Sequence, residues 1–156
     1  MLATTIADDI LKIAKLRGKS LTPMQLMKLT YIAYGWHLAM RGERLFEDRI
    51  EAWKYGPVIP TLYHATKHFG RNEIPLALIA DAPINNHELE VFLTSIVDNY
   101  AELSGIALSN LTHRAGTPWR RVFEPGVMGI EIPDALIREH YEQALNARQP
   151  RAAAAS

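Results

Sequence analysis

The sequence predicts a mainly α-helical compact domain around one central apolar helix, with one small two-stranded antiparallel ribbon. Three observations predict this fold class. Apolar residues recur at helical spacing along most of the chain, between recognisable capping residues. Residues 23–41 are apolar on nearly all sides, which is typical of a helix that its neighbours cover. Only about residues 49–54 and 128–132 have the pattern of short strands.

Two helices are predicted near the N-terminus, over about residues 5–16 and 23–41. The second has a strong start signal, because Thr22 and Gln25 can form a capping box with a proline between them. Gly35 lies inside this helix, where glycine costs about 1 kcal/mol relative to alanine. We therefore expect a second helix to cross closely at Gly35.

The middle of the chain changes to a strand pattern. A strand over about residues 49–54 is expected to end at Gly56-Pro57, and a helix over about residues 57–69 should follow, with Pro57 or Pro60 as its first residue. The second short strand, over about residues 128–132, should pair with the first. Because an isolated two-stranded ribbon is only marginally stable, this ribbon should lie on the helices.

The C-terminal half returns to helices. These are predicted at about residues 87–103, 106–114 and 133–147. Residues 1–148 are assigned to a single domain. Residues 149–156 are expected to form a disordered tail, because this segment lacks periodic apolar residues and contains Pro150.

Composition excludes several classes of protein. The chain has 17 Lys and Arg residues, 17 Asp and Glu residues and no cysteine. Zero net charge argues against a strongly basic nucleic-acid binder, and the lack of cysteine rules out disulfides and thiolate chemistry. No apolar run approaches the roughly 18–20 residues of a membrane span, so we expect no membrane association. Residues 73–102 carry six acids and no Lys or Arg, and this charge could orient a partner.

No catalytic residue, metal ligand or cofactor site is predicted. Residues 18–20 read Gly-Lys-Ser, as at the end of a phosphate-binding loop, but Ile13 stands where that motif needs its first glycine. His64 and His68 have the spacing of a metal-binding pair, without a readable third ligand. His113 lacks the serine and carboxylate spacing of a catalytic triad. We therefore expect a protein that is not an enzyme.

One short segment has the residues of a binding surface. Trp119 stands directly before Arg120 and Arg121, and His113 is close in sequence. Aromatic and arginine side chains are enriched at protein interfaces, and cations beside a ring also suit nucleic acid. A solvated helix end is the alternative interpretation. With Tyr55, these four residues are the predicted partner-binding residues.

A second aromatic cluster lies at the predicted corner between strand and helix. Trp53 and Tyr55 directly precede Gly56-Pro57, and Trp36 lies on the central helix. Large rings are costly to expose, so we expect this corner to pack over the central helix as a structural signature. A recognition corner for a partner protein is the alternative.

These residues also carry a resemblance to a known family. The pattern L-x-K-L-x-Y-x-A-x-G-W-H at residues 26–37 and the run IEAWKYGPVIP at residues 50–60 resemble the SocA-like or Panacea domain. This domain is also met in phage-associated GepA-type proteins. The sequences LTH at 111–113 and TPW at 117–119 resemble its second signature, so the resemblance covers about residues 5–145.

The resemblance implies an antitoxin, a protein encoded beside a toxin that it binds and neutralises. The family is associated with many unrelated toxins in bacteria and phages, which implies a bacterial cytoplasmic or prophage protein. Neutralisation could be direct, or the chain could be a proteolytic adaptor that delivers the toxin to an AAA+ protease. The alternatives are a DNA-binding autorepressor of its own operon, which the neutral charge disfavours, and an enzyme.

Overall fold

The computed structural model describes the backbone of residues 1–75 and 86–155, with side chains up to residue 147. The described chain is mainly helical, with one small antiparallel sheet, as predicted. The elements in chain order are α1 (Ala3–Leu16), α2 (Pro23–Arg41), β1 (Glu51–Trp53), β2 (Gly56–Val58), α3 (Pro60–Thr66), the 3-10 turn η1 (Lys67–Phe69), α4 (His87–Tyr100), α5 (Gly105–His113), α6 (Pro118–Val122), β3 (Ile130–Glu131) and α7 (Asp134–Ala155).

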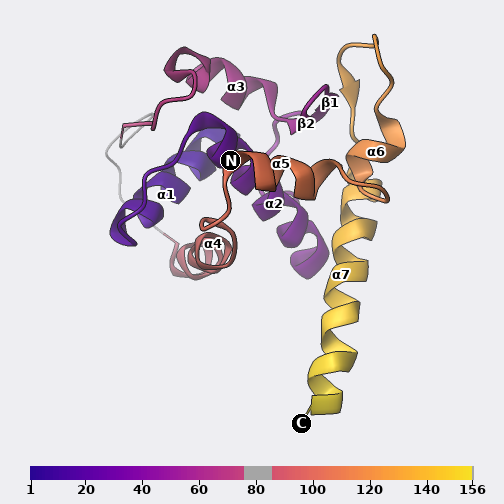
Figure 1. The fold of residues 1–156 in the computed structure, drawn as a ribbon. Coiled ribbons are helices and arrows are strands. Elements are labelled where there is room, and N and C mark those ends of the chain that lie inside the picture. Colours follow the sequence, from indigo (N-terminus) through magenta and orange to yellow (C-terminus); the bar gives the residue numbers. More distant parts are fainter. Residues whose placement is uncertain (76–85, 156) are drawn as a thin grey trace.

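Helix α2 lies at the centre, as its composition predicts. It contacts α1, α3, α4, α5 and α7 as well as strand β2 (Figure 1). The predicted capping box is present, since Thr22 Oγ1 accepts the Gln25 N–H at 3.3 Å and Gln25 Oε1 accepts the Thr22 N–H at 3.0 Å. The helix ends at Gly42, whose φ of 69° is in the left-handed region that favours glycine.

The close crossing predicted at Gly35 is the contact between α2 and α7. A Cβ on Gly35 would overlap the ring of Tyr141, which is itself buried. The same ring meets Trp36 edge-on, with ring centroids 5.2 Å apart. Glycine is therefore required here for the approach of a neighbouring side chain rather than for backbone freedom.

Helix α1 begins two residues before the predicted start, and no side chain of its own caps it. Instead, Asp48 Oδ1 accepts the Ala3 N–H at 2.7 Å. The other oxygen of this carboxylate accepts the Thr61 hydroxyl at 2.5 Å, which ties the start of α1 to α3. A carboxylate at this end also interacts favourably with the helix dipole.

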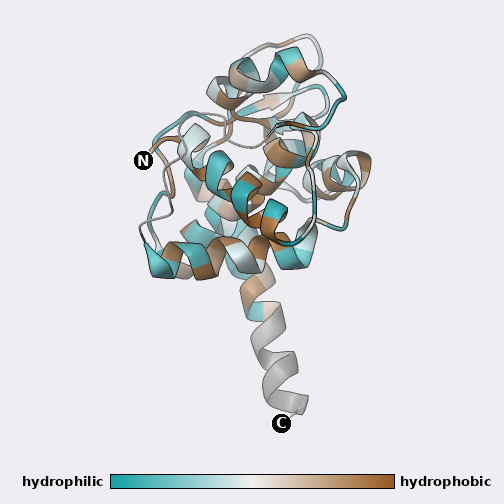
Figure 2. Ribbon diagram, turned by 90° about the vertical axis from the view of Figure 1, so that its left-hand side faces the viewer, coloured by the Kyte–Doolittle hydropathy of each residue, from teal (hydrophilic) through white to brown (hydrophobic). Residues whose placement is uncertain are grey.

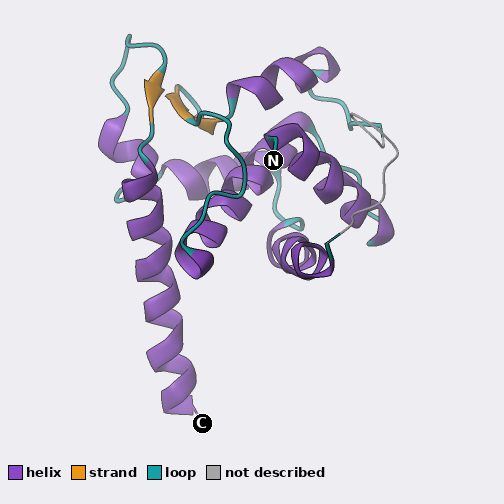
Figure 3. Ribbon diagram, turned by 180° about the vertical axis from the view of Figure 1, so that it is seen from behind, coloured by secondary structure: helices purple, strands orange, loops and turns teal. Residues whose placement is uncertain are grey.

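The sheet contains the predicted pairing and one further strand. Strands β1 and β3 are antiparallel, with Glu51 opposite Glu131. The first strand ends before Gly56-Pro57 as predicted, but these residues begin a strand that was not predicted, β2, which pairs with β1 in the order β2-β1-β3. Lys54 and Tyr55 form the intervening turn, and helix α3 begins only at Pro60. The three strands lie at one end of the molecule, near the start of α7 (Figure 3).

Helix α7 is longer than the predicted 133–147. Its N-terminus is tied to α2, because Asp134 accepts hydrogen bonds from the Tyr34 hydroxyl at 2.6 Å and from Arg44 Nε at 2.7 Å. The helical backbone continues through Pro150 to Ala155 and leaves the body of the domain (Figure 1). The end of the chain is rich in alanine, which has the highest helix propensity of all amino acids.

The helices of the body are amphipathic. Hydrophobic and hydrophilic residues alternate along them in Figure 2, as expected of helices that cover a shared core. In the ranges that the structure describes, no helix has both the length and the apolar content that a membrane span requires.

The Gly35 contact leads to a stability prediction. Gly35→Ala should lower the free energy of unfolding by about 1–3 kcal/mol, because the added methyl group forces Tyr141 away. Urea denaturation measures this change. In a Tyr141→Ala background the same substitution should cost little, and its intrinsic helix propensity should make it neutral or stabilising. An equal loss in both backgrounds would contradict the assigned overlap.

Candidate functional site

The turn between β1 and β2 presents one predicted partner-binding residue to solvent. Tyr55 is 64% exposed. Its backbone is anchored to α5, because the Ser109 hydroxyl donates a hydrogen bond of 2.6 Å to the Tyr55 carbonyl. The ring is therefore exposed on a backbone that α5 fixes in place.

Trp119 is not at the surface, contrary to the prediction. Only 4% of it is exposed. Its Nε1–H donates a hydrogen bond of 2.6 Å to the Trp53 carbonyl, and its ring stacks on Phe123 with centroids 4.6 Å apart. A buried indole with a satisfied N–H belongs to the core, so Trp119 holds α6 against strand β1.

The other predicted binding residues of this segment lie around that buried ring. Arg120 is exposed, and Arg121 is exposed but pairs with Glu139 of α7 at 3.3 Å. His113 is half-buried and meets Trp119 edge-on. Tyr55, Arg120 and Arg121 are thus accessible, whereas Trp119 is not.

Of the five signature residues, Trp36, Gly56 and Pro57 are buried as expected, whereas Tyr55 is exposed and Trp53 is not fully buried. Trp36 is buried, and its Nε1–H donates to the Tyr100 hydroxyl at 2.9 Å. Trp53 is only half-buried, since its ring packs against Tyr63 at 4.9 Å and its Nε1–H reaches Glu51. The corner therefore packs on α3 as well as on the core.

Sequence reasoning gave no role to Lys28, which is the most unusual charged residue of the structure. It lies on α2 and is 3% exposed. Its ammonium donates a hydrogen bond of 2.8 Å to the Pro57 carbonyl, and among the described residues no carboxylate lies within ion-pair distance. Burial lowers the pKa of Lys28 to about 7.

Gly56 leaves the space for this ammonium. A Cβ at Gly56 would lie 3.0 Å from Lys28 Nζ. Gly56 also has a φ of 118°, a backbone conformation that residues other than glycine rarely adopt. The signature glycine and the buried lysine are therefore parts of one arrangement. Lys28 is the only Lys, Arg, Asp or Glu of α2 before its last residue, Arg41, and this was the signal in the sequence that could have identified it.

A large groove lies directly over Lys28. Its volume is about 960 Å³, and it runs between the start of α2, the β1–β2 turn, α3 and the 123–129 loop. Ligand-binding pockets range from about 300 to 1,000 Å³, so this groove is at the upper end. Apolar side chains form most of its wall, among them Met24, Met27 and Met128.

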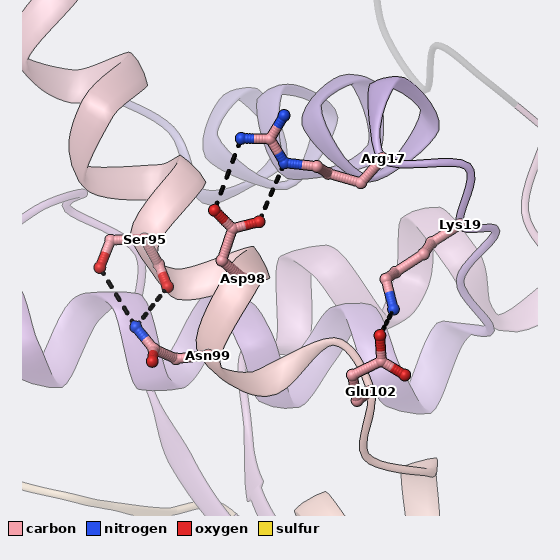
Figure 4. Close-up of polar contacts among 6 residues, drawn as sticks. All are labelled: Arg17, Lys19, Ser95, Asp98, Asn99 and Glu102. Atoms are coloured by element: carbon pink, nitrogen blue, oxygen red, sulfur yellow. Dashed lines mark hydrogen bonds and ion pairs between the residues drawn. The ribbon is translucent and has the colours of Figure 1, made fainter.

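The acidic segment has internal partners in the α1–α2 connection and at the end of α2. Asp98 of α4 accepts hydrogen bonds from Arg17, Glu102 pairs with Lys19 (Figure 4), and Glu88 pairs with Arg41 at 3.3 Å. These surface pairs dock α4 against its neighbours. They also reduce the charge that this segment can present to a partner.

The described histidines do not form an obvious catalytic or metal site. His64 lies on α3 and His68 in η1, so the helix ends between them. Within the described ranges, no three His, Asp or Glu side chains are grouped as metal ligands would be. Ser109 Oγ is 3.3 Å from His113 Nδ1, but its proton is directed to the Tyr55 carbonyl.

Comparison with known proteins identifies the matched region. A family model described as "Antitoxin SocA-like, Panacea domain" matches residues 26–120. Antitoxin SocA of Caulobacter vibrioides (strain NA1000 / CB15N) is 26% identical over 153 residues, which cover 89% of this chain and 81% of that protein. No solved structure matches the chain. The matched range includes Lys28, Gly56 and Trp119.

Burial of Trp119 leads to a second stability prediction. Trp119→Ala should lower the free energy of unfolding by about 3–5 kcal/mol. Trp119→Phe keeps a ring against Phe123 but removes the hydrogen bond to the Trp53 carbonyl, at a cost of about 0.5–1.5 kcal/mol. Exposed Arg120→Ala is the control and should change stability by less than about 0.5 kcal/mol. Chemical denaturation would refute the burial of Trp119 if its alanine variant matched the control.

Lys28 leads to a prediction about pH. The unfolded chain keeps the lysine proton up to about pH 10.5, whereas the folded chain releases it near pH 7. The unfolded state therefore binds more protons between these values, and folding becomes more favourable as pH rises. Relative to Lys28→Met, the wild-type free energy of unfolding should rise from pH 7 to pH 9 by up to about 1.4 kcal/mol per pH unit.

Urea denaturation of both proteins from pH 5.5 to pH 9 measures this difference. Below about pH 6 the two curves should run parallel, because Lys28 is then protonated in both states. Parallel curves over the whole range would show that the ammonium keeps its ordinary pKa.

Proposed function

Because the chain belongs to the SocA-like antitoxin, Panacea domain family, we propose that it neutralises a cognate toxin by binding it directly in a stable one-to-one complex. The match to an antitoxin family over residues 26–120 carries this proposal. Membership of the family supports an antitoxin role, but it does not specify how the toxin is neutralised. Direct binding is our inference from what the surface of this chain offers.

The surface supports a binding role better than a catalytic one. Tyr55 projects from a turn that Ser109 fixes, and Arg120 of α6 is also exposed. Exposed aromatic and arginine side chains are the usual anchors of protein interfaces. The serine closest to a histidine, Ser109, donates its proton to a backbone carbonyl, which disfavours it as a nucleophile.

Delivery of the toxin to an AAA+ protease is a second form of the proposal. Helix α7 continues to Ala155 and leaves the body of the domain, where a further protein could reach it. Both forms place the protein in the bacterial cytoplasm.

Autorepression through DNA binding has less support. A recognition helix needs an exposed polar face, but the central helix α2 is covered by its neighbours. The chain also has no net positive charge. Binding to DNA would therefore depend on a local group such as Arg120 and Arg121.

The experiment is co-expression with the product of the adjacent gene. We expect this product to arrest growth alone and to be tolerated together with the chain. Light scattering after size-exclusion chromatography should give a one-to-one complex, whose interface should bury about 1,600 Å² in total. Failure of the purified proteins to form a complex would contradict direct binding.

The same cells distinguish the two forms of the proposal. If the chain only blocks the toxin, the half-life of the toxin should stay the same or lengthen when the chain is present. If the chain is an adaptor, that half-life should shorten, and deletion of the protease should restore it.

A further inference from the structure

Five of the twelve large apolar side chains that are exposed in the described residues line the groove over Lys28. Those that line it come from α2, the β1–β2 turn, α3 and the 123–129 loop. They are Met24, Tyr55, Tyr63, Val127 and Met128, of which Met128 is the most exposed at 84%. A cluster of large apolar side chains around a concave surface is typical of an interaction site.

The charge of the groove has one sign. Its lining includes Lys28, Lys54 and Lys67, and none of the described lining residues is Asp or Glu. Lys54 and Lys67 are exposed, so a carboxylate of a bound partner can reach them, whereas the Lys28 ammonium is buried against the Pro57 carbonyl. Exposed charges of one sign around a binding surface favour an occupant of the opposite charge.

We propose that this groove is the toxin-binding site, and that it holds an apolar segment of the toxin whose carboxylate pairs with the exposed ammonium of Lys54 or Lys67. This inference rests on the proposed function and names its surface. The apolar wall supplies affinity by burial. The exposed lysines of the lining favour an occupant that carries a negative charge.

The openness of the rim favours a protein segment over a small molecule. Tyr55 and Met128 are more than half exposed, at 64% and 84%, so only a large occupant could cover both them and Lys28. Methionine side chains adapt to irregular partners, and Met24, Met27 and Met128 all line this groove. Of the partner-binding residues predicted from sequence, Tyr55 lines the groove, while His113, Arg120 and Arg121 do not.

The test is titration calorimetry of the chain with the purified product of the adjacent gene. Met128→Glu places a negative charge at the rim and Tyr55→Ala removes an exposed ring, and each should weaken binding roughly tenfold or more, as for central interface residues. Lys54→Met is a third variant, which removes an exposed positive charge of the lining and should weaken binding roughly two- to fivefold.

Matched controls lie outside the groove. Met40→Glu makes the same change at a methionine that is 56% exposed near the end of α2. Lys15→Met removes an exposed lysine of α1. Both control variants should bind like the wild type. Circular dichroism and thermal melting of each variant verify that the fold is intact.

The outcomes separate this inference from the proposed function. If the wild type binds and the three groove variants bind equally well, the groove assignment is overturned and the proposed function stands. Loss of binding in Arg120→Ala alone would place the interface on α6 instead. A wild-type homodimer that Met128→Glu dissociates would make a second copy the occupant and overturn the inference. Failure of the wild type to bind overturns both proposals.

Discussion

Helix α2 has almost no face that water can solvate, and this constraint shapes the rest of the domain. Five helices and strand β2 contact it, and the approach of α7 is possible only because Gly35 has no side chain. Cover is incomplete at both ends of the helix, where Met24 is 41% and Met40 56% exposed, and the groove begins at the N-terminal one. The fold and the candidate site therefore follow from the same requirement, that other elements cover α2. They cover most of the helix closely and its ends incompletely.

Much of the helical framework could be predicted from local sequence. The capping box at Thr22 and the crossing at Gly35 depend on residues close in the chain or on one unusual residue type, and both predictions were confirmed. Strand β2 was missed because Gly56-Pro57 usually interrupts regular structure. Pro57 is tolerated there since its carbonyl, rather than its missing N–H, makes the contact that matters, with Lys28.

The errors at the candidate site have a common physical cause, which is contact between residues distant in sequence. Trp119 beside two arginines resembles a surface anchor, but its N–H finds the Trp53 carbonyl 66 residues away. The cap of α1 comes from Asp48, 45 residues from the helix start. Neither partner can be found from spacing along the chain. Lys28 could be noticed in the sequence as a charged residue within a mostly apolar helix, but the groups around its ammonium are known only from the fold.

The residues at the rim of the groove are separate from those of the core, so the two sets can evolve under different constraints. Met128 and Tyr55 touch mostly solvent, so exchanging them alters the free energy of folding little. Trp119 and Gly35 are fixed by packing and admit few alternatives. A lineage can therefore vary the outer edge of the groove through many neutral intermediates while the scaffold stays constant, and can acquire a different specificity without passing through an unfolded ancestor.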